Sequence, residues 1–236
     1  MKSINSTEHK RNAIITGCFF IAATVTAIIG LKLYDPILQD PNYLITGVKN
    51  SYQIVLGAIF ESITAISAVG TAIMMYPYLK RFNESWGLGY VCFRMLEAVF
   101  ILIGILCMLT IVTFSDEYIN LTPSETQSFQ ITARLLKTTH DWTFILGPHF
   151  MLGINTFIYS VIFFKSQLVP KQLSILGITG AVLIFIGSIL EMFGVISSPT
   201  SGLIIVIALP IALYEMILAG WLIRKGFNLN VVIDEQ

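Results

Sequence analysis

Long apolar runs, broken by short polar segments, dominate the chain from near its start to near its end. Six runs are long enough to cross the hydrocarbon core of a bilayer, which is about 30 Å thick. Backbone groups in hydrocarbon must bond within their own segment, so each run is predicted to be an α-helix. The pattern predicts an all-α integral membrane bundle of six transmembrane helices, at residues 12–33, 52–79, 86–114, 142–164, 173–196 and 202–223.

The same pattern predicts one domain. Residues 1–11 form a short N-terminal segment, residues 12–227 a single six-helix transmembrane domain, and residues 228–236 a tail. The first run follows Lys10 and Arg11, as the apolar part of a signal peptide would. It is too long for that role and lacks a clear small-residue cleavage site, so we expect it to be retained.

Lysine and arginine positions predict the orientation. With a cytoplasmic N-terminus, the inner segments carry Lys2, Lys10, Arg11, Lys80, Arg81, Lys165, Lys171, Arg224 and Lys225, and the outer ones only Lys32, Lys49, Arg134 and Lys137. Cytoplasmic loops are enriched in these residues, so both termini are predicted to be cytoplasmic.

Two outer loops carry helix-start signals. Asp40-Pro41 has the pattern of an N-cap followed by proline, and Thr122-Pro-Ser-Glu125 that of a capping box. We therefore expect short interfacial helices in the first and second outer loops, the second one amphipathic through Phe129 and Leu136. They are either ordered connectors or a lid over an outward-facing cavity.

Composition supports the membrane assignment. Hydrophobic residues make up 55% of the 236 positions and charged residues 12%, half of what soluble domains carry. The formal net charge is zero and no basic patch is present, so a nucleic-acid partner is not expected. The lipid bilayer is the expected partner. Three cysteines lie inside apolar runs without metal or disulfide spacing, and no cofactor or metal is predicted.

The informative residues are ionisable ones inside the predicted spans. Each costs roughly 2.5–3.5 kcal/mol near the bilayer centre unless it is paired, solvated or neutralised. We therefore expect them to face the interior of the bundle, and small residues at helical spacing beside several of the acids mark helix-packing faces. These candidates for ligand or proton binding are Glu61, Arg94, Glu97, His149, Glu191 and Glu215.

Helix geometry predicts their relative depths. Arg94 and Glu215 lie at similar distances from the inner ends of their spans, so we expect them to pair, with Glu97 one turn further along the face of Arg94. Glu61 is placed centrally, and His149 and Glu191 toward the outside. Four glutamates face one arginine, so some must be protonated, hydrated or bound to a cation.

Three interpretations of this cluster stay open. It is a transport or binding path, with or without proton coupling, for a small lipophilic or cationic ligand. It is a site of catalysis or sensing that acts on a lipid or lipophilic molecule. Or its ion pairs only hold the bundle together. No catalytic motif is present, so no catalytic residue is assigned. His140 and His149 are nine residues apart, on opposite faces of a helix, which excludes one metal bound by both.

Several segments together resemble a known family, bacterial multi-pass membrane proteins grouped as domain of unknown function 4386. They are Tyr76-Pro-Tyr-Leu-Lys-Arg81, Leu88-Gly-Tyr-Val-Cys-Phe-Arg-Met-Leu-Glu97, Asp141-Trp142 with Gly147-Pro148, Leu168-Val-Pro-Lys-Gln-Leu-Ser-Ile-Leu-Gly177, Leu209-Pro-Ile-Ala-Leu-Tyr-Glu215 and Trp221-Leu-Ile-Arg-Lys-Gly-Phe227. The resemblance implies a protein of the bacterial cytoplasmic membrane and supplies no activity. The best prediction from the sequence is a small transporter or ligand-binding membrane protein.

Overall fold

The computed structural model describes residues 6–120, 122–196 and 202–228. Within these ranges six helices are long and apolar enough to cross a membrane, which confirms the predicted all-α bundle. They are α1 (Ser6–Leu33), α4 (Ser51–Leu79), α5 (Glu84–Tyr118), a continuous helix made of α6 (Pro123–Phe144), η1 (Ile145–Met151) and α7 (Leu152–Ser166), α8 (Lys171–Met192) and α9 (Gly202–Arg224). The short helices α2 (Asp35–Leu38) and α3 (Tyr43–Lys49) connect α1 to α4.

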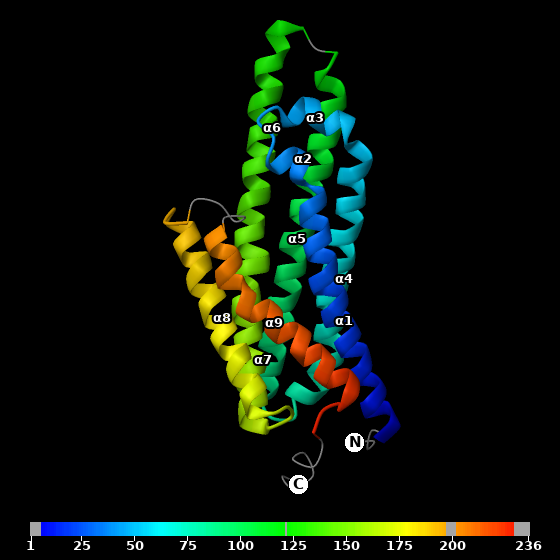
Figure 1. Cartoon of the computed structure of the whole chain (residues 1–236), viewed down its shortest axis with the longest axis vertical. Helices are drawn as coiled ribbons and strands as arrows, with labels where there is room; N and C mark the ends of the chain where they lie inside the picture. Colours follow the sequence, from blue (N-terminus) through cyan, green and yellow to red (C-terminus); the bar gives the residue numbers. More distant parts are fainter. Residues whose placement is uncertain (1–5, 121, 197–201, 229–236) are drawn as a thin grey trace.

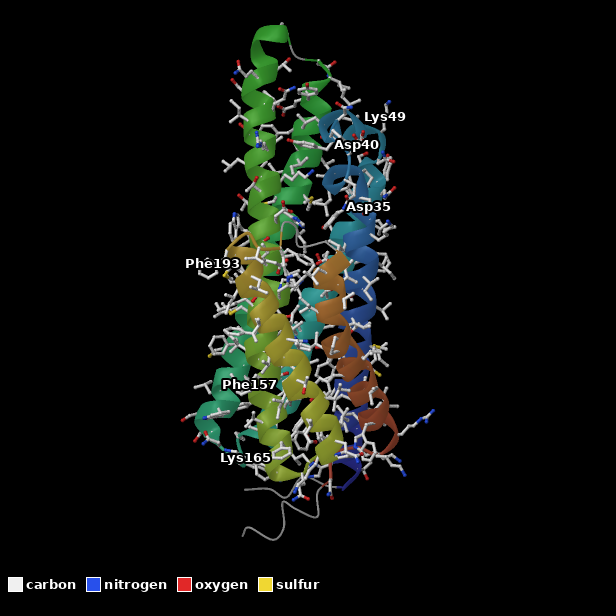
Figure 2. The ribbon with its side chains drawn as sticks, turned by 60° about the vertical axis from the view of Figure 1, so that its left-hand side comes forward. Asp35, Asp40, Lys49, Phe157, Lys165 and Phe193 are labelled. Carbon is white, nitrogen blue, oxygen red and sulfur yellow. The ribbon has the colours of Figure 1, made fainter. Side chains whose placement is uncertain are left out.

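The spans form a closed ring in which α1 contacts α4, α4 contacts α5, α5 contacts α7, α7 contacts α8, α8 contacts α9, and α9 returns to α1. The described chain begins and ends at the same end of this ring, called here the terminal end (Figure 1). Lys165 lies at this end (Figure 2), which agrees with an even number of crossings. That the terminal end is cytoplasmic stays a prediction.

The α9 helix crosses the bundle at a slant (Figure 1). Near the terminal end it packs closely on α1, where a Cβ added to Gly17 would lie 2.8 Å from the carbonyl oxygen of Ala219. Further along, it packs on α8, where a Cβ added to Gly180 would lie 2.9 Å from the Ile211 backbone. Glycine permits both contacts, because any side chain there would meet backbone. As a result α1 and α9 separate toward the opposite end.

That opposite end, called here the hairpin end, is formed by α5 and α6, which extend past α8 and α9 (Figure 1). At 1.5 Å per residue, the 35 residues of α5 are about 52 Å long and the 22 residues of α8 about 33 Å. The fourth span therefore differs from the prediction. Its helix does not start near Trp142, because the amphipathic segment before it continues into the span without a break.

This continuity changes the account of the second outer loop. Phe129 packs on Phe114 of α5, 5.1 Å between ring centroids, and Leu136 packs on the core, so the predicted apolar face covers α5 rather than lying separately at the interface. Asp141 lies well inside this continuous helix, beside His140. The side chains of residues 123–125, and with them the predicted capping box, lie outside the described part of the chain.

The helix predicted in the first outer loop is α3, which begins at Tyr43 rather than directly after Pro41. Asp40 still organises its start. Its Oδ1 accepts from the Asn42 amide at 2.7 Å and its Oδ2 from the Thr46 hydroxyl at 2.7 Å. These two hydrogen bonds hold the pKa of Asp40 below its usual value, because they favour the charged carboxylate.

An aromatic layer closes the core toward the terminal end. Tyr90, Tyr159 and Tyr214 are fully buried, and the Tyr159 ring lies 5.4 Å from that of Tyr90 and 6.0 Å from that of Tyr214. The Ser160 hydroxyl donates to the Tyr214 hydroxyl at 3.0 Å. Tyr90 lies one helical turn closer to the terminal end than Arg94, and Tyr214 is adjacent to Glu215 in the chain, so this layer borders the ionisable residues.

Candidate ligand-binding site

A cavity of about 210 Å³ lies in the middle of the bundle, above the aromatic layer. Its walls come from α1, α4, α5, α9 and the helix that contains η1. Most of the lining is apolar, as in typical ligand sites, where a few polar groups fix orientation. Five of the six candidate residues line it, namely Glu61, Arg94, Glu97, His149 and Glu215. The sixth, Glu191, does not line the cavity but is hydrogen-bonded to His149.

Arg94 is the centre of a paired cluster, called here the arginine cluster, formed with Glu97 and Glu215. Its Nη1 donates to both carboxylate oxygens of Glu97, at 2.9 and 3.2 Å, and its Nε donates to Thr71 Oγ1 at 3.2 Å. Glu215 Oε1 lies farther away, 3.9 Å from Nη2. The expected Arg94–Glu215 pair is therefore present, but Glu97 on the same helix is the closer partner.

Polar side chains that the sequence reasoning did not select complete this cluster. Asn155 Nδ2 donates to Glu97 Oε2 at 2.7 Å, and the Thr24 hydroxyl donates to Glu215 Oε2 at 3.1 Å. Asn155 is fully buried in α7. An asparagine within an apolar run is itself a signal, since an amide in hydrocarbon needs partners. Threonine carries less information, because its hydroxyl can bond to its own helix.

His149 is held by Glu191. The Nδ1 atom of His149 and Oε2 of Glu191 are hydrogen-bonded at 2.7 Å, and both residues are buried. The ring faces the cavity from η1, a π-helical turn that contains Pro148. Proline removes a backbone donor, and the wider turn accommodates that loss. No described residue bonds Nε2, so that nitrogen is left to the cavity.

Glu61 differs from the other acids. It is buried, with 8% of its surface exposed, and it forms no hydrogen bond or ion pair with any residue of the described ranges. Gly30 of α1 makes room for it, because a Cβ there would lie 2.8 Å from its Oε1. An unpaired carboxylate in such a place is costly, so Glu61 must hold a proton, water or a cation.

The cavity opens sideways between α1 and α9. The Thr24–Glu215 hydrogen bond marks the last polar contact between these helices before they separate. Beyond it, Ala27 and Leu31 of α1 face Ala208 and Ala212 of α9 along the cavity, all four half-buried, and Ile28 is 65% exposed. The lining of the cavity between α1 and α9 is therefore apolar and reaches the outside of the bundle at Ile28.

No metal site emerges from the described residues, among which no group of three or more His, Cys, Asp and Glu side chains is placed to hold a metal ion. His140 does not join the cavity. It is buried beside Tyr34, 5.9 Å between ring centroids, on another face of the helix that carries His149.

Comparison with known proteins identifies the family of this chain but assigns it no activity. Neither a curated protein nor a solved structure matches this chain. One family model does, over residues 15–226, which cover all six spans almost completely and include every residue of the candidate site. The chain therefore belongs to the family described as domain of unknown function (DUF4386).

Proposed function

We propose that the protein binds a small lipophilic cation that reaches the central cavity from the membrane. The observation that carries this proposal is the charge of a cavity open toward lipid. Three glutamates, Glu61, Glu97 and Glu215, face one permanent cation, Arg94. A cationic head group offsets one of the two excess negative charges, and its apolar part lies between α1 and α9.

Proton release accompanies binding in this proposal. Glu61 has no protein partner, so it is neutral when no cation is bound, since an unpaired carboxylate is costly. A cation that takes the place of the proton stabilises the ionised form. The binding step therefore exchanges one positive charge for another, and the net charge of the cavity does not change.

The behaviour of the aromatic layer distinguishes two forms of this function, a receptor and a transporter. Tyr90, Tyr159 and Tyr214 close the cavity toward the terminal end. A receptor keeps this layer closed, whereas a transporter must open it to release the cation on the other side. Uptake of the cation into proteoliposomes under a proton gradient distinguishes a transporter from a receptor. The family resemblance and the lysine and arginine pattern support a bacterial cytoplasmic membrane as the location.

Dodecyltrimethylammonium is a suitable probe, because it joins a compact cation to one apolar chain. Its binding is measured by equilibrium titration of the protein in lipid nanodiscs. Glu61→Gln is expected to weaken binding by about 10- to 100-fold, the loss expected for one interaction with a charged group. Glu117→Gln is the matched control, because Glu117 is exposed on α5 away from the cavity. Equal affinity of wild type and Glu61→Gln, or equal binding of uncharged dodecanol, would overturn the proposal.

A second function is favoured by His149. Its Nδ1 is bonded to Glu191 and its Nε2 is left to the cavity, an arrangement that prepares a histidine to move protons. The corresponding activity is proton transfer on a lipophilic substrate held in the same cavity. In that case His149→Gln abolishes turnover of the substrate but leaves its binding nearly unchanged, whereas a site that only binds cations shows no turnover in any variant.

A further inference from the structure

A small hollow lies beside the central cavity, on the side of the hairpin end. Its volume is about 10 Å³, and Tyr34, Glu61, His140 and Thr143 contribute its polar lining. Glu61 lines both spaces and so stands in the wall between them. The hollow is at the lower limit of the room that one water molecule requires, and buried waters bond about three polar partners.

Two of the polar groups around the hollow, on Tyr34 and Glu61, lack partners among the described residues. The Tyr34 hydroxyl is buried and makes no hydrogen bond in the described chain, although Tyr34 is only 1% exposed. Glu61 has no such bond either. Thr143 Oγ1 donates to the His140 carbonyl at 2.8 Å and keeps its lone pairs free to accept. Buried polar groups without partners cost free energy, which a bound water removes.

His140 links this hollow to the surface. Its Nδ1 lies 3.6 Å from Oδ1 of Asp141, whose side chain is 40% exposed. The opposite edge of the ring lies toward the hollow, where a Cβ added to Gly104 would be 3.4 Å from its Cδ2 and 4.0 Å from its Nε2. A histidine with one nitrogen toward an exposed carboxylate and the other toward a buried space is arranged as a proton carrier.

We propose that the hollow holds one water molecule and that Asp141, His140 and this water conduct protons between the hairpin-end surface and Glu61. The inference rests on the proposed function in one respect, that Glu61 exchanges a proton. It assigns that proton a route which avoids the cavity, so a bound cation does not block it.

The transfer conserves protons and charge. A proton from the surface passes through Asp141 to His140 Nδ1, after a small rotation of Asp141 closes the gap between them. The ring then releases the proton on Nε2 to the water, and the water gives one proton to the Glu61 carboxylate. Glu61 ends neutral, the water is restored, and His140 is neutral in its other tautomer.

The groups facing this path are few. Tyr34 and Glu61 are the titratable residues on the sides of the hollow formed by α1–α2 and α4, while α5 contributes only apolar residues and a glycine. On the surface side, Lys137 precedes Asp141 by one turn and lies over the Tyr43 ring, 5.0 Å from its centroid. The path therefore has a single histidine, and His140 is its critical residue.

Infrared spectroscopy of the protein without ligand tests the route. The wild-type minus Glu61→Gln difference spectrum identifies the C=O stretch of the neutral Glu61 carboxyl. Transfer into D₂O shifts this band as the proton exchanges. His140→Phe is expected to slow the exchange by about 100-fold, the size of a typical contribution from a positioned proton carrier. Asp141→Asn and Tyr34→Phe are expected to slow it less.

Each outcome decides the proposal. Unchanged exchange in His140→Phe overturns it, as does exchange that His149→Phe slows and His140→Phe does not, because protons would then arrive through the cavity. If His140→Phe does not fold, Asp141→Asn decides, since its half-exposed side chain tolerates the change. Absence of a Glu61 band also overturns the route. Binding of dodecyltrimethylammonium is measured on the same samples, so failure of the proposed function is seen separately.

Discussion

Glu97 and Glu61 lie on neighbouring helices and line the same cavity, yet their surroundings are opposite. Glu97 accepts from Arg94 and from Asn155, at 2.9 and 2.7 Å, so both kinds of partner satisfy its charge. Glu61 forms no hydrogen bond or ion pair with the described residues, and it borders Gly30 and the hollow that Tyr34 and His140 also line. The contrast separates two uses of a buried acid. A saturated carboxylate holds helices together, and a carboxylate without partners is available for a ligand or a proton.

The largest effect is expected from removing the cation of the arginine cluster. Arg94→Leu leaves Glu97 and Glu215 with no positive partner and should destabilise the protein by about 3–5 kcal/mol, the range for breaking a buried ion pair. Thermal unfolding in detergent measures the change. Arg134→Leu, an exposed change on α6, serves as control. A stable Arg94→Leu protein would show that the cluster does not hold the bundle together.

The two acids of the cluster should couple to Arg94 unequally. A double-mutant cycle with Glu97→Leu is expected to give about 1.5–3 kcal/mol, because the pair shares charge-assisted hydrogen bonds. The cycle with Glu215→Leu should give about 1 kcal/mol or less, since the atoms are 3.9 Å apart. Adding Glu215→Leu then rescues Arg94→Leu only partly. Equal coupling energies would contradict the distances.

Replacing Glu97 and Glu61 separately by glutamine compares directly how much each carboxylate contributes to stability. Glu97→Gln loses acceptors for Arg94 and should cost about 1–3 kcal/mol of unfolding free energy. Glu61→Gln removes no partner, so its stability should equal or exceed that of the wild type. Both variants are compared by the midpoint of thermal unfolding in the same detergent. Comparable losses in the two variants would mean that Glu61 has a stabilising partner after all.

The smallest effect should come from moving Glu61 without changing it. A Cβ at Gly30 would lie 2.8 Å from the Glu61 Cγ, and the flexible side chain can give way. Gly30→Ala should therefore leave stability within about 1 kcal/mol of the wild type and weaken dodecyltrimethylammonium binding several-fold. Gly220→Ala is the matched control, because a Cβ there has nothing within 4 Å. Unchanged binding in Gly30→Ala would place the cation elsewhere in the cavity.

The sequence predicted the six spans because the thickness of a bilayer sets the length of an apolar helix that crosses it. It identified the six ionisable residues because an ionisable side chain in hydrocarbon costs free energy and is rarely present without a partner or a function. It did not predict that five of them meet around one cavity. That depends on which helices are neighbours and on the slant of α9, set by close contacts at Gly17 and Gly180.

Local signals predicted where the helix of the second outer loop starts but not how far it continues. The capping pattern at 122–125 predicted an amphipathic helix that carries Phe129 and Leu136 toward the fourth span, and α6 begins at Pro123. Its packing on α5 and its unbroken continuation into the membrane depend on tertiary contacts. The hollow at Tyr34 and His140 was not predicted, since Tyr34 lies in a turn between helices and nothing in the sequence brings it to Glu61.

The unequal lengths of the spans have a consequence for the surrounding lipid. A bilayer that matches the about 33 Å of α8 leaves the first turns of α4 and the last turns of α5 above the hydrocarbon, since these helices have 29 and 35 residues. Hydrophobic mismatch is relieved by thinning or thickening the bilayer locally. The mismatch is therefore smallest at α8 and α9, which have 22 and 23 residues, and largest at α4 and α5. The lipid beside α9 keeps its ordinary thickness, so a lipophilic molecule meets the protein there without a deformed bilayer between them.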